Sequence, residues 1–379
     1  MEGRTLRWCF YVSTIQLACI GAALNSCPIV AANQSQDRAP TAQSKTQTKT
    51  STEEAELQKG IDLTRQGLFV DAIPHFLVAK GHVDDEYAAE FNLALCYVGT
   101  KQHSDAIRIL TKLRDSGHAD ANVESLLSQA LIAKGQPREG WEALKRAAVL
   151  TPKAEKLYAF VGDACADRHD YTLGLQVVDL GLQNLPNSAR LHYERGYFLS
   201  LLDRFDEAKD EFDLPQKLAP QSEVAILAET QKYYFEGNLP DTIRVARAAV
   251  REGRANYLVL AVLGEALLRS GAVPSQPEFA EAEAALRKSV GAKPGYPTSQ
   301  VAMGHLLLLN NRQDEALEHL EKARELDPRN PAVYVQLRAA YRKRGESQKA
   351  EEMLGVLARL NAEEAARINA APGDRRAIP

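Results

Sequence analysis

The chain has 379 residues and a formal net charge of −4. A hydrophobic content of 45% with 25% charged residues is typical of a folded protein and excludes a chain that is disordered throughout. The slight acidic excess also argues against a nucleic-acid partner, because such a partner requires a basic stripe on the protein.

The first 32 residues have the plan of a signal peptide. Two arginines precede an apolar run at residues 8–24, and residues 30–32 (Val-Ala-Ala) offer the small side chains that a signal peptidase requires. The run is short and contains polar residues, which argues against a membrane span. We therefore expect cleavage after Ala32. Two alternatives remain open: a lipoprotein acylated at Cys27, and an uncleaved N-terminal anchor helix.

Two further segments have the polar composition that is typical of disordered, solvent-exposed chain. Residues 33–52 contain almost no apolar side chain and are expected to form a disordered linker. Residues 365–379 are expected to form a disordered tail after a polar capping turn.

Between these segments the chain repeats one unit, which is clearest at residues 297–330. Apolar residues at helical spacing predict two amphipathic helices, with a break at Asn310-Asn311 and a stop at Pro328. Gly304 and Ala316 are small where the two helices must meet, so the backbones can approach closely. One such pair cannot bury its own apolar face, so it requires stacked copies.

The small residues recur with a period of 34 residues, interrupted by one step of 40. The first-helix position holds Gly60, Ala94, Ser128, Gly162, Gly196, Thr230, Gly264 and Gly304, and fails at Arg338. The second-helix position holds Ala72, Ala106, Gly140, Gly174, Ala208, Thr242, Ala282, Ala316 and Ala350. Nine units result, beginning at Glu53, Tyr87, Ala121, Glu155, Ala189, Glu223, Tyr257, Pro297 and Pro331.

These residues occupy the W-x2-L-G-x2-Y, A-x3-F and terminal Pro positions of the tetratricopeptide repeat, and residues 53–364 resemble that family. The resemblance implies an all-α fold, a right-handed superhelical solenoid of nine helix-turn-helix repeats. It also implies recognition of a protein or peptide along the inner face, which the first helices line.

The candidate recognition surface can be read from the first helices. The second, fifth, ninth and twelfth residues of each repeat share one helix face, distinct from the packing face. Aromatic residues concentrate there in the fifth and sixth repeats, and aromatic side chains suit partner binding. The predicted partner-binding residues are Tyr193, Tyr197, Leu227, Gln231 and Tyr234. The alternative, that these side chains only pack between the two first helices, remains open.

Two departures from the repeat draw attention. Pro215 lies inside the second helix of the fifth repeat, which predicts either a helix shortened by one turn or a local change of curvature. The seventh repeat has six extra residues within residues 271–279, which predict a longer turn between its helices. This loop is either passive or a second binding site.

Nothing in the sequence indicates an enzyme. Cys96 and Cys165 are a whole repeat or more apart, so we expect free, buried thiols. Cys165 and His169 have a spacing that suits a metal, but a structural site needs four ligands and no others are in view. No metalloprotease, nucleophile-elbow, phosphate-loop or dinucleotide motif occurs. We expect no catalytic residue, no metal and no cofactor.

The sequence therefore predicts a non-enzymatic exported scaffold or adaptor, periplasmic or secreted, that binds a protein or peptide partner in the concave groove. We expect no nucleic acid partner, and membrane attachment only through a lipid anchor or an uncleaved leader. The alternative is an envelope assembly component, acylated at Cys27 in one version, that works inside a multi-protein complex.

Overall fold

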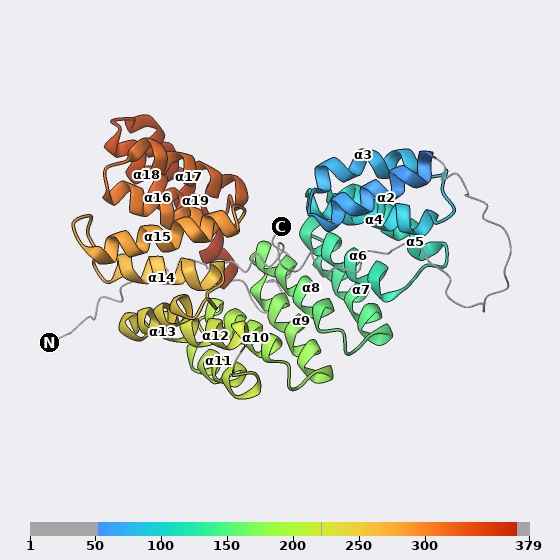
Figure 1. Cartoon of the computed structure of the whole chain (residues 1–379), viewed down its shortest axis with the longest axis horizontal. Helices are drawn as coiled ribbons and strands as arrows, with labels where there is room; N and C mark the ends of the chain where they lie inside the picture. The colour runs from blue at the N-terminus through green and yellow to red at the C-terminus, as the bar shows by residue number, and fades with distance from the viewer. Residues whose placement is uncertain (1–51, 221, 370–379) are drawn as a thin grey trace. The chain divides into compact units, whose positions relative to one another are not determined.

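The computed structural model describes residues 52–220 and 222–369, and these ranges contain helices and no strand (Figure 1). The helices are α2 (Thr52–Arg65), α3 (Phe69–Ala79), α4 (Glu86–Gly99), α5 (His103–Asp115), α6 (Ala121–Lys134), α7 (Pro137–Leu150), α8 (Glu155–Asp167), α9 (Tyr171–Asn184), α10 (Ala189–Leu201), α11 (Phe205–Leu218), α12 (Glu223–Phe235), α13 (Leu239–Arg251), α14 (Tyr257–Arg269), α15 (Pro277–Ala292), α16 (Pro297–Leu309), α17 (Gln313–Leu326), α18 (Pro331–Lys343) and α19 (Ser347–Asn369). They form nine antiparallel pairs in chain order, so the predicted all-α repeat fold is confirmed for the described residues.

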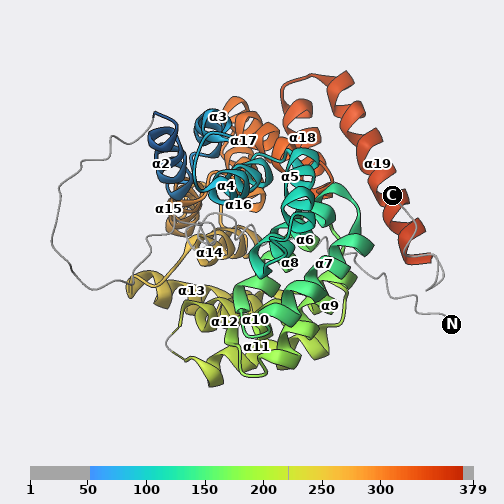
Figure 2. The same ribbon diagram turned by 90° about the vertical axis from the view of Figure 1, so that its right-hand side faces the viewer.

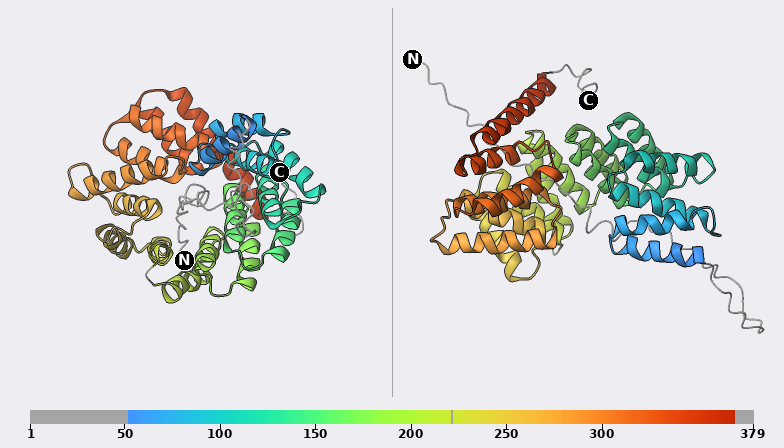
Figure 3. Two further views of the ribbon diagram at one scale, coloured as in Figure 1. Left: turned by 45° about the vertical axis from the view of Figure 1, so that its right-hand side comes forward. Right: turned by 90° about the horizontal axis from the view of Figure 1, so that it is seen from above.

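The helix pairs belong to two compact units, and the boundary between them in the chain falls between Pro186 and Asn187. The first contains α2–α9, and the second contains α10–α19. Within each unit a helix packs against its neighbours in the chain, and each first helix also contacts the next first helix, as α4 contacts α6 and α12 contacts α14 (Figure 2). Each unit is therefore a solenoid of stacked pairs, visible as successive layers in Figure 3.

The paired small residues allow the two helices of a repeat to approach closely. A Cβ atom on Gly304 would lie 2.5 Å from Cγ of Leu320, and one on Gly264 would lie 2.5 Å from Cγ of Leu286. Both distances are below any real carbon contact, so only glycine fits at these positions. In the third repeat, the Ser128 hydroxyl donates to the Gly140 carbonyl at 2.7 Å. The packing that the sequence predicted from small residues is thus observed.

Each turn from first to second helix uses the same backbone device. The fifteenth residue of every repeat has a positive φ, which lets it close the first helix in the left-handed region. Glycine holds this place at Gly67, Gly135, Gly237, Gly271 and Gly345, while Lys101, His169, Asp203 and Asn311 hold it elsewhere. The predicted break at Asn310-Asn311 is confirmed. His169 accordingly has a turn position, and its Nδ1 lies 2.8 Å from the Tyr171 hydroxyl.

Many first helices also begin behind a capping side chain. The caps that accept a backbone N–H from the first turn are Asp85, Asp120, Ser188, Ser222, Asn256 and Asn330. Each satisfies donors that the helix itself leaves without a partner. The start of the first helix matches the predicted residue in seven repeats and precedes it by one residue in the first two.

The two predicted departures from the repeat are Pro215 in α11 and the insertion in the seventh repeat, and the structure describes both. α11 keeps 14 residues with Pro215 inside it, so the expectation of a helix shortened by one turn is wrong. Pro215 lies in the last turn and removes a single backbone donor, and the N–H of Ala219 still donates to its carbonyl at 2.9 Å. The insertion in the seventh repeat lengthens both the turn and the second helix. The turn between α14 and α15 comprises residues 270–276, whereas the corresponding turn of the eighth repeat comprises residues 310–312. α15 has 16 residues, whereas α17 has 14.

The predicted leader at residues 1–32 and the linker as far as residue 51 lie outside the described residues, as does the tail from residue 370. α19 continues to Asn369, so the predicted border at residue 364 falls inside this helix.

Candidate partner-binding site

The five predicted residues lie together on the neighbouring first helices α10 and α12. Tyr193 and Tyr197 belong to α10, and the other three belong to α12. All five are buried, with at most 3% of each residue exposed. The Tyr193 hydroxyl donates to Oε1 of Gln231 at 3.0 Å. Such burial fits the packing alternative, and partner binding by these five side chains stays a prediction.

Polar groups on this face are not all satisfied. Within the described part of the chain, Nε2 of Gln231 and Oε2 of Glu265 are buried without a hydrogen-bond partner. Glu265 lies on α14 beside Tyr234, and the Arg269 guanidinium lies 4.8 Å from the centre of the Tyr234 ring. Burial raises the pKa of Glu265. The hydrogen bond with Tyr234 and the positive charge of Arg269 lower this pKa, but the effect of burial is larger. Burial likewise raises the pKa of Tyr234.

An aromatic cluster joins these buried residues to the surface. The ring of Phe212 on α11 lies 6.1 Å from that of Tyr193 and is stacked on Phe235 at 6.0 Å with an interplanar angle of 8°. Tyr234 meets Phe235 edge-on at 6.1 Å. At the outer end, Phe205 opens α11 and is 42% exposed. The cluster therefore extends from the core of the second unit to solvent.

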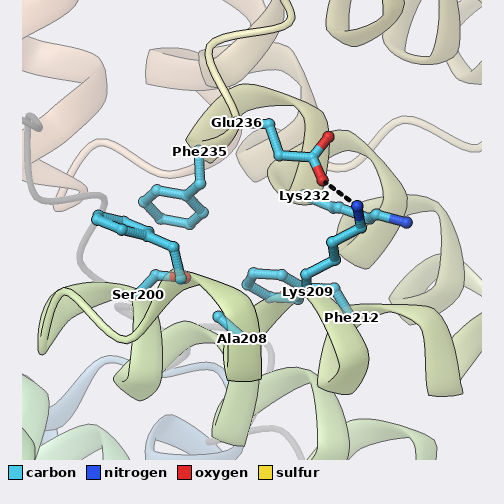
Figure 4. A pocket seen from close by; sticks show the side chains of 8 residues that line it. Ser200, Ala208, Lys209, Phe212, Lys232, Phe235 and Glu236 are labelled. Atoms are coloured by element: carbon cyan, nitrogen blue, oxygen red, sulfur yellow. Dashed lines mark ion pairs between the residues drawn. The ribbon is translucent and has the colours of Figure 1, made fainter.

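A small pocket lies at the exposed end of this cluster (Figure 4). Its lining residues are Ser200, Phe205, Ala208, Lys209, Phe212, Lys232, Phe235 and Glu236. The free volume of about 30 Å³ has room for one or two water molecules. Small-molecule and cofactor sites usually have roughly 300–1,000 Å³. The pocket therefore suits the tip of a side chain presented from outside, and not an enclosed cofactor.

Two lysines border the pocket, and they are held differently. The Lys232 ammonium is 2.5 Å from Oδ1 of Asp213, and only 15% of the Lys232 side chain is exposed. The Lys209 ammonium is 3.6 Å from Oε1 of Glu236, and 56% of the Lys209 side chain is exposed. Exposed ion pairs of this kind contribute little. Lys209 is consequently the cation that an incoming group can recruit at low cost.

Two other buried glutamates have basic partners outside their own helix. Glu124 on α6 is 1% exposed and accepts from the Arg146 guanidinium at 2.9 and 3.0 Å. Glu90 on α4 accepts from Lys112 at 2.7 Å and forms an ion pair with Lys80 at 3.2 Å. Burial would raise the pKa of Glu90, but these two lysines lower it overall. The Lys112 and Arg146 pairs join a first helix to the second helix of the same repeat, and Lys80 links the end of α3 to the next repeat, which is a structural role.

Cys96 and Cys165 are free and buried, as predicted. Burial raises the pKa of Cys96 to about 12 and that of Cys165 well above its ordinary value. Both therefore remain protonated thiols at neutral pH, and a protonated thiol is a poor nucleophile. Across residues 52–220 and 222–369, no group of three or more His, Cys, Asp or Glu side chains is placed to hold a metal ion. None of the helices described here has the length and apolar character to cross a membrane.

The sequence prediction selected the first helices of the fifth and sixth repeats and did not include the aromatic residues of the second helix between them, of which Phe205 is exposed. Phe212 occupies the A-x3-F position after Ala208, and Phe205 lies three residues before that alanine. Both belong to a second helix, whereas the predicted binding residues all lie on first helices. An aromatic residue at the start of a second helix was the signal that could have revealed the pocket.

Comparison with known proteins gives a family match and distant relatives. A tetratricopeptide repeat model matches residues 310–371. The mitochondrial import receptor subunit TOM70 of Homo sapiens is 30% identical over 176 residues, which cover 44% of this chain and 28% of the receptor subunit. The same subunit of Rattus norvegicus is 26% identical over 200 residues, or 51% of this chain and 32% of the subunit. The chain thus spans about three tenths of these relatives.

Two solved structures resemble the chain at low sequence identity. Yeast Tom70 has a TM-score of 0.48 and 18% identity, with 85% of this chain and 84% of that chain covered. A tetratricopeptide repeat protein from Parabacteroides merdae has a TM-score of 0.46 and 15% identity, with 76% of this chain and 98% of that chain covered.

Proposed function

We propose, since this chain is a tetratricopeptide repeat protein, that it is a non-enzymatic scaffold that binds a protein or peptide partner along the first-helix face of its repeats. Proteins of this family are scaffolds that bind polypeptides and are typically not enzymes. The finer part of the proposal places the partner at the fifth and sixth repeats, in the groove that their first helices line.

The aromatic cluster of α10, α11 and α12 supports a partner site at the fifth and sixth repeats. Its inner rings are buried, while Phe205 is 42% exposed and the pocket beside Phe235 is open to an incoming side chain. Aromatic residues that are rigidly backed and open on one side are the usual anchors of protein interfaces.

A peptide array tests the proposal directly. The purified full chain would be applied to immobilised 13-residue peptides of varied sequence, and the strongest binders would be titrated in solution. We expect a subset of peptides to bind and to compete with one another, as one shared groove requires. A chain that is folded by circular dichroism but binds no peptide would refute the proposal.

We further propose that the chain is exported and works in the periplasm or outside the cell. The support is the sequence of residues 1–32, with its arginines, apolar run and small residues before Asn33. The mature chain is expected to begin at or near Asn33 when its N-terminus is sequenced from the native source. Intact Met1 would reject this cleavage, and an acylated Cys27 would instead identify the membrane-anchored assembly component.

A second candidate function is that of a receptor for polypeptides that are being imported across a membrane. It is favoured by the 30% identity over 176 residues with a mitochondrial import receptor subunit. Fractionation of the native cell separates the two candidates, because an import receptor is expected in an organelle membrane fraction and an exported scaffold outside the cytoplasm.

A further inference from the structure

We propose that the pocket beside Phe235 takes an apolar side chain of the partner, while Lys209 binds a carboxylate next to that side chain. The partner would then present an acidic, hydrophobic segment. This inference rests on the proposed function and specifies the chemistry of the partner that the same region recognises.

The walls of the pocket define the apolar half of the ligand. The rings of Phe212 and Phe235 are parallel with their centres 6.0 Å apart, and Ala208 lines the pocket from the same helix as Phe212 (Figure 4). The Ser200 hydroxyl is already committed, because it donates to the Gly196 carbonyl at 2.8 Å. The pocket therefore offers an apolar surface with no polar group available at its base. An aliphatic side chain that covers Phe205 and Phe235 removes exposed aromatic surface from water.

The rim defines the charged half. Two lysines and one glutamate line the mouth, and Lys209 is the most accessible of the three, with 56% of its side chain exposed against 34% for Glu236 and 15% for Lys232. Lys232 is fixed by Asp213, whereas Lys209 is mostly exposed and only loosely paired with Glu236. A partner carboxylate can therefore displace or share the Lys209 contact, because Lys209 is the charged side chain that an incoming residue reaches first. This charge arrangement favours an acidic residue beside the apolar one.

The test uses three fluorescein-labelled peptides of 13 residues in a Gly/Ser background, with Leu-Asp, Ala-Asp or Leu-Lys at the centre. The full chain is expected to bind the Leu-Asp peptide about tenfold more tightly than either of the others. Fluorescence anisotropy gives the three dissociation constants.

Two variants and one matched control locate the effect. Lys209→Glu should reverse the charge preference, so that the Leu-Lys peptide binds more tightly than the Leu-Asp peptide. Phe235→Ala should abolish the preference for leucine over alanine. Lys217→Glu makes the same charge change on an exposed lysine of the same helix that does not line the pocket, and it should leave the charge preference in place. Because Phe235 also packs on Phe212, Lys209→Glu is the variant that stays informative if Phe235→Ala unfolds.

The outcomes are distinguishable. A charge preference that Lys209→Glu leaves unchanged would overturn the inference. If array peptides bind, but equally well to the wild type and to both pocket variants, the inference fails and the proposed function stands. If neither the array nor the panel contains a binder, both are overturned.

Discussion

Gly304 shows how strongly one residue can constrain a repeat. Its place against Leu320 leaves no room for a Cβ atom, so Gly304→Leu must separate α16 from α17. Overpacking of this kind costs about 1–3 kcal/mol or more. We expect a loss of that size in urea unfolding. Gly291→Ala near the end of α15 is the control, because nothing lies within 4 Å of the added Cβ and alanine has a higher helix propensity than glycine.

Replacing Tyr197 and Tyr234 distinguishes a packing role from a partner-binding role for the five residues predicted from the sequence. Both are buried, at 0% and 3% exposed, so replacement by alanine should leave cavities. A large aromatic side chain in a core contributes about 3–5 kcal/mol, and we expect the Tyr197→Ala, Tyr234→Ala variant to lose at least that much stability. A variant that unfolds at the wild-type urea concentration but binds peptides weakly would restore these residues to the partner surface.

His305 should make stability depend on pH. Burial on α16 lowers its pKa below the ordinary value of 6.5. Below pH 6.5 the unfolded chain therefore binds more protons at this residue than the folded chain, and folding stability falls as the pH falls toward the lowered pKa. His305→Gln cannot titrate, so its stability should decline less than that of the wild type between pH 8 and pH 5.5. Equal declines in urea unfolding would contradict this account.

At the scale of the element, the turn inside each repeat is the most regular feature. Its fifteenth residue has a positive φ in all nine repeats, including φ 62° at Lys101. A left-handed conformation costs a non-glycine residue roughly 1–2 kcal/mol, which glycine avoids. We expect Lys101→Gly to stabilise the chain by roughly 0.5–1 kcal/mol after the entropy of the unfolded glycine is counted. Gly135→Ala, at φ 90°, should destabilise it, and thermal unfolding of both variants checks the pair.

The regular helices of the repeats were predictable from the sequence, because the spacing of apolar and small residues identifies the buried face of each helix. The first helix of the eighth repeat begins at the predicted Pro297, and its glycine contacts the expected partner helix. The irregular elements were harder. Whether Pro215 ends α11 depends on how many turns follow it, and the division of the insertion between turn and α15 depends on packing that the sequence does not display.

The candidate site was predictable only in part. Sequence spacing placed Tyr193 and Tyr197 on the same stripe as Gln231, and the structure brings Tyr193 and Gln231 into contact. Spacing along one helix does not reveal what covers that helix, so the burial of the stripe was not predictable. The pocket combines α10, α11 and α12, and its exposed Phe205 comes from a second helix that the stripe excludes.

At the scale of the molecule, the contacts predict that damage stays near its source. Among the described residues, the main helix contacts in either unit are between neighbours in the chain and between successive first helices. Such quasi-one-dimensional packing confines a disturbance to adjacent repeats. Hydrogen exchange of Gly304→Leu should therefore show faster exchange in α15–α18 and unchanged exchange in α2–α9. Uniform loosening of all nine repeats would contradict the one-dimensional arrangement.

The most direct test of the proposed binding function is hydrogen exchange of the full chain with and without the tightest peptide from the array. Slower exchange is predicted in α10 and α12, and at the start of α11 beside Phe205, because bound peptide excludes water from these segments. Protection confined to the second helices of other repeats, such as α3 and α7, or no protection at saturating peptide, would contradict the account.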